Sequence, residues 1–169
     1  MGASGSATIE FVIVVPVILS LLFTSIDFGV MMIRQVSLDS AVERAAREVR
    51  LGGIRDVDTF RAAVCSHTQM LRNCEDTIAI EMRAIDPSNP IGLTDPDRCI
   101  NREEPIGEQT LPGFDAQGDM TRIMITRVCV AANPFLGVTN WVMGLPEMPT
   151  GGVAVVSRTA WVNEPVDEA

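Results

Sequence analysis

The sequence contains no lysine and only one histidine, so all 13 basic residues are arginines. Aspartate and glutamate together number 22, and the formal net charge is −9. Domains that bind nucleic acid carry a basic footprint, and this balance therefore predicts no nucleic-acid partner. The single histidine and the scattered acids also form no nucleophile–base pair with a catalytic signature. The sequence accordingly predicts neither an enzyme nor a cofactor.

The charges that are present are unevenly distributed. Before residue 34 the only charged side chains are Glu10 and Asp27. Residues 34–72 carry seven arginines against five acids, whereas residues 73–169 carry six arginines against fifteen acids. The chain thus divides into an apolar beginning, a weakly basic segment and an acidic body, and its length suits one domain with an appendage.

A long apolar stretch runs from Phe11 to Ile33 and is interrupted by one charge, that of Asp27. As a helix it spans about 35 Å, enough to cross a hydrocarbon core of about 30 Å. A cleaved secretory signal would have basic residues before the run and a small-x-small site after it, and both features are missing here. We therefore predict a retained transmembrane helix.

This helix is predicted to continue beyond the membrane to about residue 50, because apolar residues recur at helical spacing on one face. The apolar positions are Leu38, Ala41, Val42, Ala45, Ala46 and Val49. Gly52-Gly53 provides a stop signal. A second, short helix is predicted at about 58–71, with Asp56 and Asp58 at its positive end. Its apolar face comprises Phe60, Ala63, Val64, His67 and Leu71.

After residue 74 the apolar period changes from that of a helix to that of a strand. Residues 77–85 alternate, whereas residues 121–132 and 152–162 are β-branched, as strands buried on most of both faces are. The predicted fold class is α+β, with a long amino-terminal helix, a short helix and an antiparallel sheet of three to four strands. The sheet packs on the amphipathic half of the long helix.

Two connecting segments carry further expectations. Residues 86–120 are too long for a plain connection and are predicted to be a functional loop or one ordered by a disulfide. Their acidic residues are interpreted as solvated charge, since the pattern of a calcium loop is missing. Residues 133–150 are apolar but contain three prolines. A short helix is expected around 137–144, with a membrane- or partner-facing patch as the alternative.

Four cysteines follow the apolar run, at positions 65, 74, 99 and 129. An even number in a small exported domain predicts two disulfides. We expect Cys65–Cys74 across the end of the short helix and Cys99–Cys129 between the long loop and a strand, although four cysteines allow three connectivities. A zinc site that includes His67 is the weaker reading, because the paired CxxC spacing is missing.

Glu10 stands at the start of the apolar run, where a carboxylate costs at least about 2.5 kcal/mol. Gly5 precedes it by five positions and Phe11 follows it. This arrangement resembles the processing site of type IV prepilins, and a Glu followed by an aromatic residue resembles the tight-adherence (Tad/Flp) branch. The sequence from residue 5 to about residue 50 is similar to the TadE-like minor pilins, or pseudopilins, of that system.

The resemblance implies that a prepilin peptidase cleaves between Gly5 and Ser6 and leaves Glu10 as the fifth mature residue. The new amino group of Ser6 would pair with the Glu10 carboxylate of a neighbouring subunit, so that two buried charges compensate each other. The implied partners are other pilin or pseudopilin subunits, bound through the amino-terminal helix, and the inner-membrane assembly platform. No metal is implied.

The implied protein is a single-pass component of the bacterial inner membrane with its carboxy-terminal domain in the periplasm, or a part of the extracellular pilus. Its segments would be a leader at 1–5, a transmembrane helix at 6–33, its amphipathic continuation at 34–53 and a periplasmic α+β domain at 54–169. Its role would be pilus assembly or initiation, adhesion and biofilm formation. Two alternatives stay open: an uncleaved membrane-anchored periplasmic binding module and an anchored metal-binding protein.

Asp27 is the second charge in the apolar run. The simpler expectation places its carboxylate near the outer membrane–water boundary, either protonated or facing headgroups. The alternative is a contact in a helix bundle, since Ser25 and Gly29 flank it at the small-xxx-small spacing that lets membrane helices approach closely.

Overall fold

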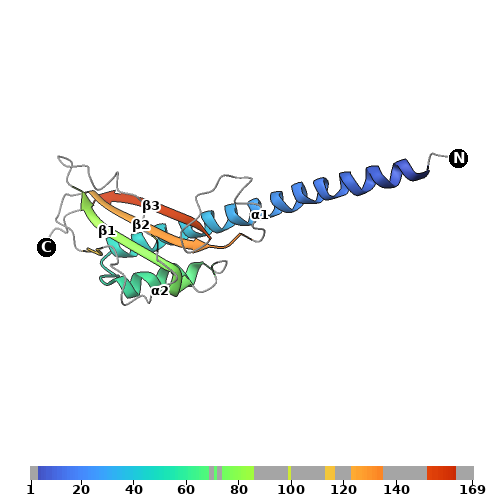
Figure 1. Cartoon of the computed structure of the whole chain (residues 1–169). Coiled ribbons are helices and arrows are strands. Elements are labelled where there is room, and N and C mark those ends of the chain that lie inside the picture. The colour runs from blue at the N-terminus through green and yellow to red at the C-terminus, as the bar shows by residue number, and fades with distance from the viewer. Residues whose placement is uncertain are drawn as a thin grey trace, which may run out of the picture.

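The computed structural model describes residues 4–68, 71, 74–85, 99, 113–116, 123–134 and 152–162. These residues form α1 (Ser4–Arg50), α2 (Val57–His67), α3 (Cys74–Thr77), β1 (Ile78–Ile85), β2 (Ile123–Ala132) and β3 (Val153–Val162). The amino-terminal half of α1 projects away from the rest of the molecule (Figure 1). Its second half lies along the sheet on the same side as α2. We call the second half of α1, the two short helices and the sheet together the body. The predicted α+β fold, with a long first helix and an antiparallel sheet, is confirmed.

The helix α1 contains 47 residues and is therefore about 70 Å long. All six positions of the predicted apolar face are buried. The helix ends in a Schellman motif, in which the Gly53 N–H donates to the Glu48 carbonyl and the Gly52 N–H to the Val49 carbonyl, both at 2.9 Å. Gly52 has a φ of 75°, which costs glycine little because it has no Cβ. The predicted stop at Gly52-Gly53 is confirmed.

Asp56 caps the amino terminus of α2. Its carboxylate accepts hydrogen bonds from the backbone N–H of Thr59 at 2.8 Å and from the Thr59 hydroxyl at 2.7 Å. These bonds, the backbone one first, lower the pKa of the Asp56 carboxyl below its ordinary value, because they favour the ionised form. Phe60 and Val64 then point from α2 into the core.

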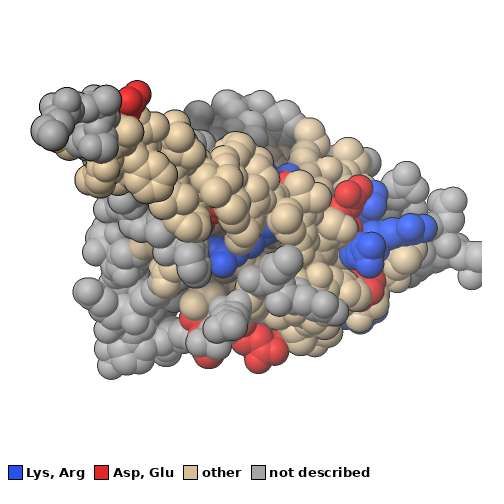
Figure 2. All heavy atoms as spheres, turned by 90° about the vertical axis from the view of Figure 1, so that its right-hand side faces the viewer, with Lys and Arg blue, Asp and Glu red and all other residues tan. Residues whose placement is uncertain are grey.

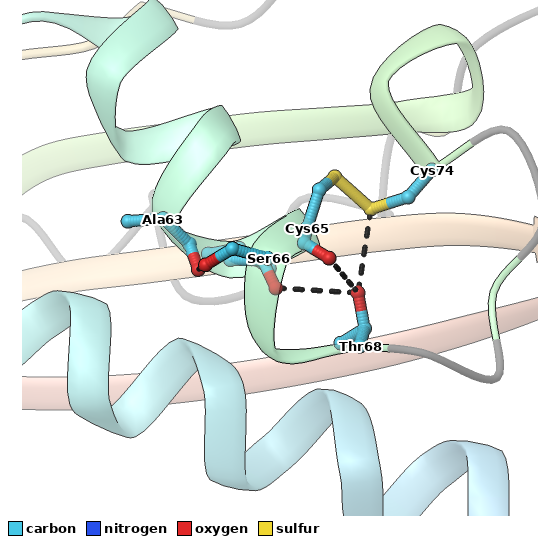
Figure 3. Close-up of a disulfide and its surroundings, with 6 residues drawn as sticks. Ala63, Cys65, Ser66, Thr68 and Cys74 are labelled. Carbon is cyan, nitrogen blue, oxygen red and sulfur yellow. Dashed lines mark hydrogen bonds between the residues drawn. A yellow bond between two sulfur atoms is a disulfide. The ribbon is translucent and has the colours of Figure 1, made fainter.

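The carboxy-terminal end of α2 differs from the prediction. The helix ends at His67, four residues early, where the Thr68 hydroxyl bonds back to the carbonyls of Val64 and Cys65 at 3.2 and 3.3 Å. The Cys65–Cys74 disulfide then joins this end to α3 (Figure 3). Because the helix stops here, Thr68 is buried and His67 is exposed. The expected place of His67 on a buried face was therefore wrong.

The sheet has the order β1-β2-β3, and both strand pairs are antiparallel. The central strand β2 is buried from Met124 to Ala132. In contrast, β3 alternates between buried and more exposed residues. The expectation that β3 is buried on both faces was wrong, because it lies at the edge of the described sheet and only one of its faces meets the helices.

The core lies between one face of this sheet and the helices α1 and α2. Its largest fully buried side chains include Leu38, Phe60, Met82, Met124 and Val128. The described residues of the 86–120 segment add to this core at the outer edge of β1. Phe114 forms a parallel bridge with Met82, and its ring lies 5.7 Å from that of Phe60.

The other face of the sheet combines small apolar residues with a charged group. The Glu81 carboxylate lies 3.1 Å from Arg83 Nε and 3.8 Å from Arg127 on the neighbouring strand. Arg127 is buried, and an opposite charge offsets part of the cost of removing a guanidinium from water. The Cys99–Cys129 disulfide attaches the segment before β2 to this same face.

Candidate assembly helix

The free half of α1, residues 7–26, presents its apolar side chains outward. Exposed large hydrophobic residues occur on all sides of the helix, among them Ile9, Phe11, Val14, Ile18, Leu22 and Ile26. A helix that is apolar all round belongs in a protein core or in a membrane. This half of α1 is outside the core of its own chain, and its length and composition are those of a helix that could span a membrane.

Three hydroxyl groups of this half donate within the helix. Ser20 donates to the Val17 carbonyl at 2.8 Å, Thr24 to the Ser20 carbonyl at 2.7 Å and Ser25 to the Leu22 carbonyl at 2.7 Å. Such bonds remove unpaired donors from an apolar environment, where each would cost several kcal/mol. Pro16 also lies in this half, and helices that span membranes tolerate proline.

The proposed processing and assembly residues lie at the beginning of α1. Gly5 and Ser6 fall in its first turn. Glu10 and Phe11 follow one turn later, and both side chains are exposed. Glu10 is thus presented on the outside of an apolar rod, and it has no described contact with the body.

Asp27 marks the point at which the body begins. Its side chain is 2% exposed, so the expectation that it faces headgroups was wrong. Ser25 remains exposed, and a Cβ on Gly29 would meet no atom within 4 Å. Asp27 therefore points toward the body of its own chain, whereas Ser25 and Gly29 stay open to other molecules.

Arg34 and Gln35 attach α1 to the sheet region a few residues beyond Asp27. Neither was predicted to have this role. Arg34 donates to the Asn133 carbonyl at 2.7 Å, and Gln35 donates to the Val156 carbonyl at 2.9 Å. The helical spacing of the buried residues could have identified these two positions. The buried positions from Leu38 onward, extended backward by three and four residues, lead to 34 and 35, then to 31, and then to 27.

The disulfides lie in the body. Cys65 and Cys74 have their Cα atoms 5.6 Å apart, and those of Cys99 and Cys129 are 5.1 Å apart. All four cysteine sulfurs are in disulfides, so the alternative zinc site at the cysteines and His67 would have no thiolate ligands. Within the described ranges no group of three or more His, Cys, Asp and Glu side chains could hold a metal ion. The acidic residues at 95, 97, 103 and 104 and the helix expected at 137–144 lie outside the described residues.

The charges gather on the body. Figure 2, which looks at the molecule from its amino-terminal side, shows an acidic side chain near the tip of the free helix and then an uncharged surface. Basic and acidic side chains then appear together on the rest of the molecule. This distribution suits a helix inserted into an apolar phase and a body in water.

The fold and the exposed helix define a class: an α+β body carried on a projecting apolar helix. Within the described residues α1 is the one helix long and apolar enough to cross a membrane. A family model, that of TadE-like proteins, matches residues 5–47, roughly a quarter of the chain. The match confirms the predicted resemblance and implies a protein associated with the Tad pilus. No curated protein and no solved structure matches the chain.

Proposed function

We propose that this protein is a non-enzymatic minor pilin or pseudopilin of a tight-adherence pilus, acting in pilus assembly or initiation and thereby in adhesion and biofilm formation. One observation carries the proposal: about 20 residues of α1 stand free of the body with their apolar side chains exposed and a single carboxylate, Glu10, at their start. These residues lie inside the segment that matches TadE-like proteins.

The chemistry of assembly follows from two groups. A prepilin peptidase hydrolyses the peptide bond between Gly5 and Ser6, which leaves a carboxylate on Gly5 and an amino group on Ser6. The protonated amino group pairs with the Glu10 carboxylate of a neighbouring subunit in a bundle of α1 helices. Each charge alone would be costly in that bundle, and the pair offsets part of this cost.

The chain then divides into the leader 1–5, the transmembrane helix 6–33, its continuation 34–53 and a periplasmic domain 54–169. Two disulfides suit an oxidising compartment such as the periplasm. The free half of α1 binds other pilin subunits. The assembly platform in the inner membrane binds the protein, which then either enters the fibre or stays in the membrane.

The test is the amino terminus of the full-length protein extracted from membranes of cells with an active prepilin peptidase. The intact mass should correspond to a chain that starts at Ser6. A Gly5→Leu variant should keep residues 1–5, whereas the matched Gly2→Leu variant should be processed normally. Wild-type protein that retains residues 1–5 beside an active peptidase would contradict the proposal.

A further inference from the structure

The exposed apolar surface of α1 does not end where the body begins. On the side that faces away from the body, Phe28, Met32, Ile33 and Val36 remain exposed, the last by 66%. The body is already present at Asp27 on the opposite side of the helix. Over about 14 Å of helix length, one side of α1 is therefore exposed and apolar while the opposite side faces the body.

The polar groups of this overlap are turned toward the body. Asp27 is buried, and Arg34 and Gln35 donate to carbonyl groups of Asn133 and Val156. The outward face becomes polar only from Asp39 and Ser40 onward, which are both exposed. The boundary with water on that face thus falls between Val36 and Asp39.

The length of the apolar face points to lipid as its occupant. From Glu10 to Val36 the helix rises about 39 Å, close to the roughly 35–37 Å of the hydrocarbon core together with the headgroup layer on one side. With Glu10 at the inner edge of the hydrocarbon, Asp27 lies about 25 Å further along. That depth is still within a core of about 30 Å. Arg34 then falls in the headgroup layer on the side of the body.

We propose that the body is seated in the lipid headgroup layer, with the end of the sheet at Asn133 at headgroup level and the outward face of residues 28–36 in contact with lipid. The body shields Asp27 from the hydrocarbon, which explains why a carboxylate is tolerated at that depth. This inference rests on the proposed membrane insertion of α1, and it is independent of cleavage after Gly5.

The test places single tryptophans along α1 in the full-length protein. Trp141 and Trp161 are replaced by phenylalanine, and tryptophan is introduced by Leu22→Trp, Ile33→Trp, Val36→Trp or Leu51→Trp. All four positions are exposed, so the indole does not disturb the core. The protein is reconstituted in vesicles of phosphatidylcholine and phosphatidylglycerol that contain either acyl-brominated lipid or a headgroup nitroxide.

We expect bromine deep in the acyl chains to quench Leu22→Trp and the headgroup nitroxide to remove most of the emission of Ile33→Trp and Val36→Trp. Leu51→Trp, about 27 Å beyond Ile33, should respond only to iodide in water. An Ile33→Trp signal quenched by iodide and not by lipid would overturn the proposal, because the body would stand clear of the membrane.

Protection of Ile33→Trp from both quenchers, lost on dilution of the protein in lipid, would also overturn it and would assign the outward face to a second helix. The control for the underlying assumption is Leu22→Trp. If lipid fails to quench that variant, α1 is not inserted, and the proposed membrane anchoring fails rather than the seating of the body.

Discussion

The two halves of α1 share one uninterrupted helix and differ in every other respect. Residues 7–26 are exposed and apolar on all sides, whereas residues 38–49 bury one face and expose charges on the other. The first half contributes no side chain to the described core, whereas the second half packs against the sheet. The secondary structure of α1 is therefore continuous at Asp27, whereas the burial of its side chains changes there.

The comparison separates folding from assembly. Substitutions in the packed half should alter the free energy of unfolding of the body, because they change contacts inside the chain. Substitutions in the free half should leave that free energy unchanged and alter insertion or association. The following experiments test this separation, beginning with the largest expected effect.

Replacing Glu10 by alanine should abolish piliation in a complemented deletion strain while the protein stays inserted. Insertion should if anything improve, because a charge is removed from the apolar helix. The amino group of Ser6 would then enter the bundle without its partner, and breaking a buried pair in this way costs about 3–5 kcal/mol. Surface fibres, membrane level and processing are scored together.

The Glu10→Gln variant separates charge from shape, since it keeps the size of the side chain and loses the ion. It should fail as Glu10→Ala does. Normal piliation by both variants at wild-type levels would show that the carboxylate has no part in assembly.

Leu38→Ala and Val36→Ala form a matched pair within one turn of α1. Leu38 is 0% exposed and Val36 is 66% exposed. Leu38→Ala should destabilise the body by about 3 kcal/mol through the cavity it leaves, whereas Val36→Ala should stay within about 0.5 kcal/mol of wild type. Denaturant unfolding in mild detergent measures both, and equal losses would contradict the assignment of Leu38 to the core and of Val36 to the outward face.

The disulfide that closes the longer stretch of chain should stabilise the body more than the other, although the dependence on loop length is only logarithmic. Their sequence separations are 9 and 30, which correspond to about 2.5 and about 3.5 kcal/mol in the chain-entropy model. Serine replacement of each pair, followed by thermal unfolding, should reproduce that order without changing membrane insertion. Peptide mapping under non-reducing conditions checks the pairing, and four free thiols in periplasmic material would refute it.

The smallest effect is expected at Asp56. Its pKa is lowered in the folded protein by the hydrogen bonds from Thr59, so its stabilising contribution is complete above the ordinary carboxyl pKa and is lost as the pH falls through the lower, folded value. The difference in Tm between wild type and Asp56→Ala should therefore shrink in acid. Asp56→Asn keeps a capping side chain without the titration, and its Tm difference from Asp56→Ala should not change with pH.

Much of the fold was predictable because its signals are local. The spacing of Leu38 to Val49, the glycine pair at 52 and the alternation of β1 each identify an element within a few residues. The early end of α2 was not predictable in this way. Thr68 ends that helix by bonding back to carbonyls of the preceding turn, a competition with helix continuation that apolar spacing alone does not reveal.

The residues of the candidate site likewise divide into those that local sequence identifies and those that depend on tertiary structure. Gly5, Glu10 and Phe11 are recognisable in sequence because their spacing carries the resemblance. The burial of Asp27 depends on where the sheet lies, which is a tertiary property. The Arg34 and Gln35 contacts bridge 99 and 121 residues of chain, and no local pattern identifies their acceptors.

The packed half of α1 also has a mechanical consequence. The strands cross the packed half of α1 obliquely (Figure 1), and the buried face of α1 extends along the helix from Asp27 to Val49. A pull on the free end of α1 therefore acts as shear along this whole surface and not as a peeling force at one end. Asp27 and Met31, the first buried residues of this face, meet the tension first, and the bonds of Arg34 and Gln35 and the apolar contacts behind them share it.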